Sequence, residues 1–211
     1  MNLTSKLAAK YKVLSDYNIP KIPDALKHAK TLREKQYLQI IEELMSSVKK
    51  DPMTGLQHKE HFQGLDKGKG VFIMIDGDGL KKINDTYGHA AGHAAILSLS
   101  DGIKASLRSK DKATITNVTR AGGDEFLVHM ENVLSLATGV SIAKRMLESI
   151  NKQSMADHYN GDKHIRDALS NMILQASIGV GFTEKEADEA MYKAKQKGRN
   201  RVEFHRVLKA A

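Results

Sequence analysis

The spacing of hydrophobic residues along the chain changes between that of strands and that of helices. Residues 71–75 form a continuous apolar run of strand length, which predicts a central strand buried on both faces. Two glycines, Gly122 and Gly123, lie in the turn of a predicted hairpin. Further strands are expected where short apolar runs lie between polar turns, at residues 114–119, 126–130, 172–180 and 201–204.

Three other segments place apolar residues three and four positions apart, which predicts helices at residues 92–107, 139–150 and 184–197. Gly198 follows the third segment at a position where glycine commonly ends a helix. Strands and helices therefore alternate after residue 51. This alternation indicates an α/β or α+β sheet domain.

The first fifty residues differ from the rest of the chain. Pro20 and Pro23 interrupt any helix there, and Asp24 can cap a helix that runs to about Lys50. Because fewer than three heptads are visible, its apolar stripe is more typical of packing within one domain than of a coiled coil, although dimer formation through it stays open. The stripe comprises Tyr37, Ile40, Ile41, Leu44 and Val48. We expect an N-terminal helical extension over residues 1–50, a folded domain over 51–205 and a tail over 206–211.

Composition excludes several classes of protein. The 211 residues contain no Cys, which rules out a disulfide scaffold, a Cys-ligated zinc or iron–sulfur site and a thiol nucleophile. The longest purely apolar run, residues 71–75, is far shorter than the ~18 residues that indicate a membrane span. The N-terminus also lacks the apolar stretch of a signal peptide. We therefore expect a cytoplasmic protein with no membrane partner.

The formal net charge of +8 is concentrated at the two ends of the chain. Residues 1–50 have a charge balance of +5 and residues 191–211 one of +6, whereas the segment between them has −3. A clustered basic patch can bind nucleic acid. However, aromatic residues make up only 5% of the chain, and no finger or recognition-helix pattern is present. A nucleic-acid partner is therefore not expected.

Two acidic clusters stand at the ends of predicted strands. Asp76 and Asp78 follow the central strand, and Asp124 and Glu125 lie in the glycine-containing hairpin turn. If the hairpin lies beside the central strand, three or four carboxylates converge. Hard carboxylate oxygens suit Mg²⁺ or Mn²⁺, and two-metal phosphoryl transfer requires such an array. A single Asp is more often a solvated turn residue, but the coincidence at two strand ends favours a metal site.

Other motifs for metals or nucleotides fail on their spacing. A calcium loop that began at Asp76 would need Glu where Tyr87 stands. His89 and His93 have the spacing of a zinc-protease motif, but Ala90 replaces its catalytic Glu. No glycine-rich P-loop is present.

Five stretches of the chain match, in order, the motifs of one family. The third reads Gly-Gly-Asp-Glu-Phe, and together they resemble the GGDEF domain of bacterial diguanylate cyclases. The resemblance implies a palm-like α+β fold related to nucleotidyl cyclases, with a mainly antiparallel central sheet flanked by helices. It also implies a homodimer in which two GTP-loaded subunits make cyclic di-GMP and release pyrophosphate. The five stretches are residues 51–56, 76–89, 122–126, 177–180 and 187–202.

The resemblance also implies the catalytic and metal-binding residues. Asp76 and Asp124 match the family's metal-binding carboxylates, with the carbonyl group of Gly77 as a further ligand. Two Mg²⁺ or Mn²⁺ ions are expected in each active site. Glu125 matches the acidic residue associated with deprotonation of the attacking 3′-hydroxyl group. Asp78 stands close by, but the resemblance does not assign it to the metal.

Nucleotide contacts are implied in the same way. Lys81, Lys195 and Arg199 match cations that hold the triphosphate, where negative charge develops as pyrophosphate leaves. Asn84 matches the residue that reads the guanine edge. His93 departs from the family, because it stands where an Asp usually accepts two hydrogen bonds from guanine. A neutral imidazole offers only one acceptor.

Three functions therefore stay open. The first is GTP-specific synthesis of cyclic di-GMP, and the second is the same chemistry with altered base specificity, which uses ATP as well and makes cyclic GMP-AMP or another adenine-containing product. The third is a non-catalytic regulator that binds nucleotides. Ala113 and Thr116 stand where many members carry an Arg-x-x-Asp inhibitory motif, so feedback inhibition through that motif is not expected.

Overall fold

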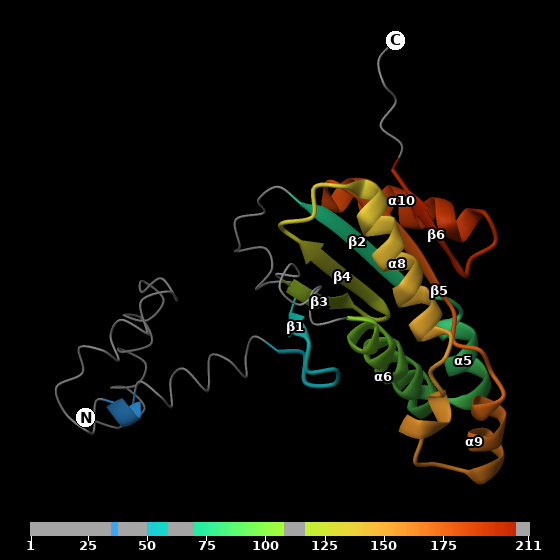
Figure 1. The fold of residues 1–211 in the computed structure, drawn as a ribbon. Coiled ribbons are helices and arrows are strands. Elements are labelled where there is room, and N and C mark those ends of the chain that lie inside the picture. The colour runs from blue at the N-terminus through green and yellow to red at the C-terminus, as the bar shows by residue number, and fades with distance from the viewer. Residues whose placement is uncertain (1–34, 38–49, 59–69, 108–116, 206–211) are drawn as a thin grey trace. The chain divides into compact units, whose positions relative to one another are not determined.

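The computed structural model describes residues 35–37, 50–58, 70–107 and 117–205 (Figure 1). The chain divides into two compact units, residues 1–49 and residues 50–211. Residues 35–37 are helical and fall within the helix predicted from Asp24, but Lys50 forms an antiparallel bridge with Gln57. Most of the predicted helix, most of its apolar stripe and the C-terminal tail lie outside the described residues.

One six-stranded sheet forms the centre of the second unit (Figure 1). Its strands are β1 (Gln57–His58), β2 (Val71–Gly77), β3 (Asn117–Gly122), β4 (Glu125–Met130), β5 (Ala176–Gly181) and β6 (Arg201–Phe204). They lie in the order β1-β3-β4-β2-β5-β6. The central pairs β3 with β4, β4 with β2 and β2 with β5 are antiparallel, and only the edge pairs are parallel. The prediction of a mainly antiparallel α+β sheet is confirmed.

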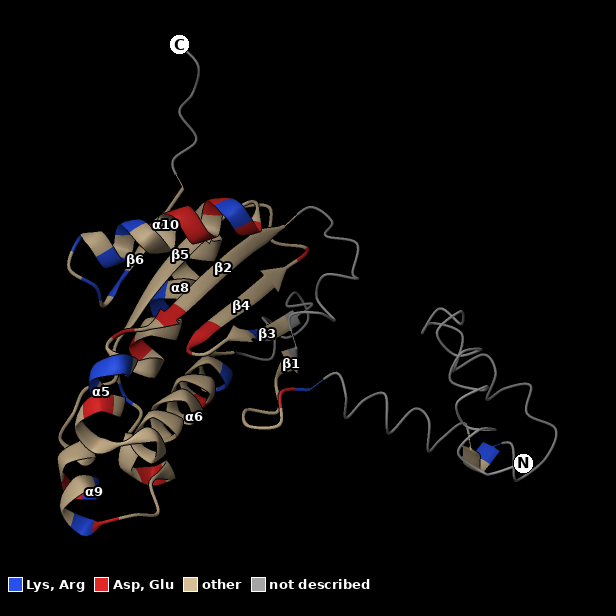
Figure 2. Cartoon of the chain, turned by 180° about the vertical axis from the view of Figure 1, so that it is seen from behind, with Lys and Arg blue, Asp and Glu red and all other residues tan. Residues whose placement is uncertain are grey.

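Helices cover both faces of this sheet. The described ranges of this unit contain the helices α5 (Leu80–Tyr87), α6 (His89–Ser106), α8 (Leu136–Ile150), α9 (Lys163–Ser170) and α10 (Glu184–Gln196), with a 3-10 turn, η2, at Met155–His158. Helices α6 and α8 pack on one face of the sheet (Figure 1), whereas α10 packs on the other and lies in front of it in Figure 2.

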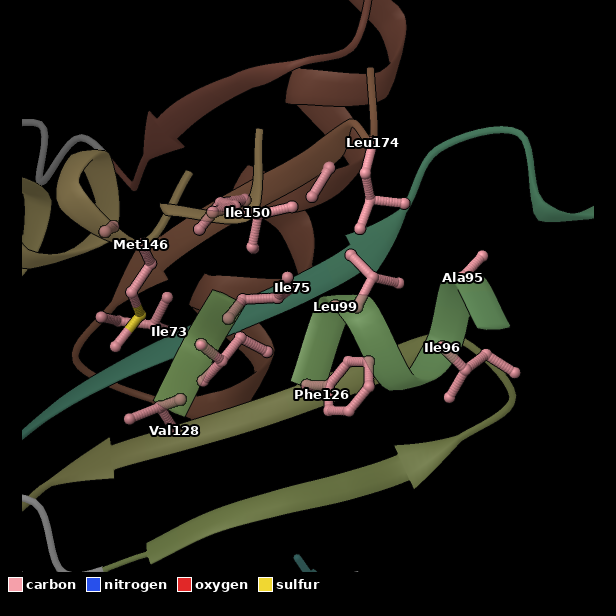
Figure 3. Packing of buried hydrophobic residues seen from close by; sticks show 14 of the residues in the cluster. Ile73, Ile75, Ala95, Ile96, Leu99, Phe126, Val128, Met146, Ile150 and Leu174 are labelled. Carbon is pink, nitrogen blue, oxygen red and sulfur yellow. The ribbon is translucent and has the colours of Figure 1, made fainter. Parts of the chain in front are cut away.

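Strand β2 is central, and all of its residues are buried, as its continuous apolar run predicted. Ile73 and Ile75 enter the core beneath α6 and α8, whose side chains surround them in Figure 3. Phe72 and Met74 pack on the opposite face, against α10. Because side chains of a strand alternate between faces, Asp76 follows Phe72 and Met74 toward α10.

Two glycines of β5 allow α10 to lie directly on the sheet. A Cβ atom on Gly179 or Gly181 would collide with the backbone of α10 near Ala187. Ile178 and Val180, which alternate with these glycines along β5, enter the core on the other face of the sheet. This close approach brings the last turn of α10 to the end of β2.

Several boundaries differ from the predictions. Helix α6 begins at His89 rather than at residue 92. The strand predicted at residues 172–180 begins only at Ala176, because the chain before it is still leaving α9, with Met172 N–H donating to the carbonyl oxygen of Leu169. The start of the strand predicted at 114–119 lies outside the described residues, and β3 continues to Gly122, which shortens the hairpin turn.

Two helices, α5 and α9, had no counterpart among the predictions. Each is eight residues long and mainly polar, with a single buried residue, Ile83 in α5 and Leu169 in α9. Their apolar residues do stand three or four positions apart, Leu80, Ile83 and Tyr87 in α5 and Ile165 and Leu169 in α9, and all pack on the core. Each segment spans only about two helical turns, too short for this spacing to stand out from the sequence.

Candidate active site

The two acidic clusters of the sequence meet where β2 and β4 lie side by side, at the red strand ends in Figure 2. Asp76 of β2 pairs directly with Glu125 of β4 in the antiparallel register. Asp124 lies in the turn before β4, and its carbonyl oxygen accepts a hydrogen bond from Gly77 N–H at 3.2 Å. Gly123 adopts the positive φ of 50° that this tight turn requires. The expected convergence of carboxylates is therefore present.

The two aspartates of this cluster are short of counter-charge. Burial raises the pKa of Asp76 above its usual value, and repulsion from Asp124 adds to the increase, although Lys195 opposes it. Burial likewise raises the pKa of Asp124; its own backbone hydrogen bond and Lys195 lower it, and Glu125 raises it. A cation bound between these carboxylates would relieve their repulsion.

Lys195 supplies part of the positive charge that these aspartates need. It extends from the last turn of α10, and its Nζ lies 2.7 Å from Oδ2 of Asp76. The sequence assigned Lys195 to the triphosphate, whereas the structure places its ammonium group on a carboxylate assigned to the metal. The two assignments are compatible, because a lysine that contacts the metal-binding carboxylate is also close to phosphates bound there.

The donor set fits a hard divalent cation. A Cβ atom on Gly77 would lie 3.6 Å from Oδ2 of Asp124, so this carboxylate lies directly over the backbone that follows Asp76. Within the described parts of the chain, no three His, Asp or Glu side chains form a metal site by themselves. The two aspartates and the Gly77 carbonyl group nevertheless provide the oxygen ligands that Mg²⁺ or Mn²⁺ prefers, and water or phosphate oxygens would complete them.

The two residues assigned to the base are carried by adjacent helices, α5 and α6. Asn84 of α5 lies against α6 exactly where Gly92 leaves room, since a Cβ atom on Gly92 would collide with the amide group of Asn84. His93 is the next residue and is exposed. The glycine that weakens the helical pattern of residues 89–93 therefore has a packing role, and it brings Asn84 beside His93.

The remaining cations assigned to the triphosphate, Lys81 and Arg199, lie in the segments that follow β2 and α10. Lys81 is exposed in the first turn of α5. Arg199 lies in the loop between α10 and β6, and its Nε is 3.9 Å from Oδ1 of Asp78. Ser177 Oγ and the backbone N–H of Asn200 bind the carboxylate of Asp78, and its charge adds to the rise in the pKa values of Asp76 and Asp124.

One contact near the site was not predicted from the sequence. Arg120 donates to the carboxylate of Asp51 and, through Nε and Nη2, to the carbonyl oxygen of Gly123 in the active-site turn. Asp51 opens the first motif stretch, and Arg120 stands two residues before the third. In the sequence, only the charge of Arg120 beside a glycine turn indicated a contact. The pairing of Arg120 with Asp51 spans 69 positions of sequence, which no local pattern reveals.

None of the helices in the described ranges is long and apolar enough to cross a membrane.

Comparisons with known proteins show the family and the fold of the chain. A family model described as "Diguanylate cyclase, GGDEF domain" matches residues 48–201. Diguanylate cyclase A of Treponema denticola is 33% identical over 176 residues, which cover 76% of this chain and 45% of that protein. The uncharacterized protein YtrP of Bacillus subtilis is 32% identical over 141 residues, which cover 67% of this chain and 22% of that protein. The chain thus spans less than half the length of these curated relatives.

Solved structures show the same fold. The GGDEF domain of PA1120 from Pseudomonas aeruginosa superimposes with a TM-score of 0.60 at 26% identity, covering 74% of this chain and 94% of that chain. The coiled coil and GGDEF domain of DgcB from Caulobacter crescentus, in complex with c-di-GMP, gives a TM-score of 0.67 at 18% identity and covers 87% of this chain and 99% of that chain. At that identity the second likeness concerns the fold alone.

Proposed function

Because the chain belongs to the diguanylate cyclase GGDEF family, we propose that it condenses two GTP molecules into cyclic di-GMP and releases two molecules of pyrophosphate. One observation carries this proposal. Asp76, Asp124 and Glu125 lie together at the ends of β2 and β4, with Lys195 against them. Such a cluster suits phosphoryl transfer, in which positioning and charge neutralisation supply most of the catalysis.

Asp76, Asp124 and the Gly77 carbonyl group would hold Mg²⁺ or Mn²⁺, two ions per site in our proposal. A metal held by these residues would neutralise charge on the phosphate oxygens and on the attacking oxygen. Glu125 accepts the proton of the 3′-hydroxyl group as its oxygen attacks the α-phosphorus of the other nucleotide. The bond from the α-phosphorus to pyrophosphate breaks as the new phosphodiester forms. Lys81, Lys195 and Arg199 hold the triphosphate and the departing pyrophosphate.

The reaction needs two nucleotides that attack each other, so we propose that two copies of the chain face one another during catalysis. Each copy then brings one nucleotide, bound through Asn84 and His93 at the base. The exposed position of His93 beside Gly92 is compatible with a contact to the base edge.

Product analysis tests the proposal. The whole chain is incubated with GTP, with ATP or with an equal mixture, in the presence of Mg²⁺ or Mn²⁺, and the products are identified by mass spectrometry. We expect a cyclic dinucleotide and pyrophosphate from the wild type. The matched control is Glu125→Gln, which keeps the side-chain size but cannot accept the proton; it should bind GTP and form no product. Absence of any dinucleotide from the wild type would overturn the proposal and favour a regulator that only binds nucleotides.

A second candidate, synthesis of cyclic GMP-AMP or another adenine-containing product, is favoured by His93. A neutral imidazole accepts one hydrogen bond where a carboxylate accepts two, and a buried donor without a partner costs about 1–3 kcal/mol. His93→Asp should therefore raise the preference for GTP over ATP by roughly 10- to 100-fold. An unchanged product ratio would contradict a contact between His93 and the base.

A further inference from the structure

Asp78 is a buried aspartate near the candidate active site that the proposed chemistry does not use. Its side chain is only 4% exposed. Oδ1 accepts a hydrogen bond from Ser177 Oγ at 2.7 Å, and Oδ2 accepts one from the backbone N–H of Asn200 at 2.9 Å. Both oxygens of this carboxylate therefore accept hydrogen bonds from the protein.

The loop that Asp78 binds has a strained backbone. Arg199 has a φ of 60° and Asn200 a φ of 45°, so two consecutive residues other than glycine adopt the left-handed conformation. This conformation costs free energy for residues with a Cβ atom and persists only where surrounding contacts hold it. The N–H of Arg199 donates to the carbonyl oxygen of Ala194 at 3.0 Å, which closes the end of α10. The next N–H, that of Asn200, is held by Asp78.

The strained pair includes a residue with a proposed function. Arg199 is 62% exposed, so few contacts of its own restrain its side chain, and its Nε lies 3.9 Å from Oδ1 of Asp78. Lys195, four residues earlier, contacts Asp76 at 2.7 Å. Asp76 at the end of β2 and Asp78 in the turn after it thus each lie against one of the three cations assigned to the triphosphate.

We propose that Asp78 is a positioning residue: by binding the Asn200 N–H and facing the Arg199 guanidinium, it holds the loop in the conformation that presents Arg199 to the triphosphate. This inference rests on the proposed function, because it assumes that Arg199 contacts a nucleoside triphosphate. Asp78 itself contacts neither the nucleotide nor the metal. Its removal should weaken the binding of triphosphate through Arg199 and leave the carboxylate cluster in place.

A double-mutant cycle tests this role, with GTP affinity measured by calorimetry in the presence of Mg²⁺. All variants carry Glu125→Gln, so that GTP is not consumed. Asp78→Ala should weaken GTP binding about 10-fold, the effect of losing one charge-assisted hydrogen bond. In an Arg199→Ala background the same substitution should have little further effect, because the residue through which it acts is gone. Equal effects in both backgrounds would overturn the proposal.

Two further variants separate positioning from folding. Asp78→Asn retains an oxygen that can accept from Asn200 N–H and an amide that can donate to Ser177, but it lacks the charge that faces Arg199. It should bind GTP more tightly than Asp78→Ala and more weakly than the parent. Ser177→Ala removes the other contact and leaves the Asn200 contact, so it should change GTP affinity less than Asp78→Ala does. A larger effect of Ser177→Ala would contradict the proposal.

The outcome also distinguishes this inference from the proposed function. GTP binding that follows the cycle, in a wild-type protein that forms no dinucleotide, would support the role of Asp78 and overturn the synthase. Failure of the parent protein to bind GTP would overturn both.

Discussion

Arg120 and Asp51 form a buried ion pair, with Nη1 of Arg120 at 3.0 Å from Oδ2 and 3.2 Å from Oδ1 of Asp51. Their side chains are 13% and 9% exposed. Nε and Nη2 of Arg120 donate to the carbonyl oxygen of Gly123, one residue before Asp124. Asp51 also accepts hydrogen bonds from the backbone and hydroxyl of Thr54. The first turn of the second unit is thereby connected to the turn that carries the acidic cluster.

Asp51→Ala should destabilise the protein by about 3 kcal/mol, because it leaves Arg120 buried without its carboxylate. Urea denaturation measures the loss. Lys185→Ala is the control, since the Lys185–Glu189 pair is exposed and an exposed pair contributes less than about 1 kcal/mol. Similar losses for the two variants would contradict the importance of the buried pair.

Asp51 should also make stability depend on pH in acid. Burial alone would raise the pKa of Asp51, but the hydrogen bonds from Thr54 and the charge of Arg120 together hold it below its usual value of 3.8. The unfolded chain then binds more protons than the folded one below about pH 4, so this contribution to the free energy of unfolding is present above that pH and is lost as the pH falls through the lowered pKa. In Asp51→Asn the free energy of unfolding should fall less steeply over this range. A series of urea titrations at different pH values checks the slope, and identical slopes would refute the prediction.

Asp124→Asn should stabilise the metal-free protein while abolishing synthesis. The raised pKa values of Asp76 and Asp124 mean that their charged forms are disfavoured in the folded state. In the wild type, the free energy of unfolding should therefore decrease as the pH rises from 3.8 through the raised pKa values, since the folded state binds more protons there. Removing one charge should increase the free energy of unfolding near neutral pH by about 1 kcal/mol, a gain common for single stabilising substitutions.

Thermal unfolding with a chelator present measures that gain. Asp167→Asn, at an exposed position of α9, is the matched control, and it should change neither stability nor activity. If Asp124→Asn were less stable than the wild type, the electrostatic account of the acidic cluster would be wrong.

Gly92→Ala should reduce stability and nucleotide affinity, although replacing a helical glycine by alanine normally stabilises a protein by about 1 kcal/mol. The new Cβ atom would collide with the amide group of Asn84, and α5 would have to move away from α6. The comparison variant is Ala90→Gly, at an exposed position of the same helix, which should lower stability through helix propensity alone and leave GTP affinity unchanged. A more stable Gly92→Ala protein with normal GTP affinity would contradict the close packing of Asn84.

The sequence by itself determined the parts of this protein whose burial follows a local pattern. The apolar run at 71–75 correctly indicated a central strand buried on both faces, and β6 occupies the residues expected for it. The order of elements and the motif stretches together indicated the α+β sheet and the residues of the candidate site. Hydrophobic spacing succeeds for these elements because it records which side of each segment faces the core.

Only the tertiary structure decided which side chains meet. The antiparallel register that sets Asp76 opposite Glu125, and the seating of α10 that brings Lys195 to Asp76, depend on elements far apart in the chain. The same holds for the contact between Asp78 and Asn200, which spans 122 positions. Periodicity reports that a residue is buried or exposed but carries no information about its partner. Partners are chosen by the packing of whole elements, and this packing assembled the site.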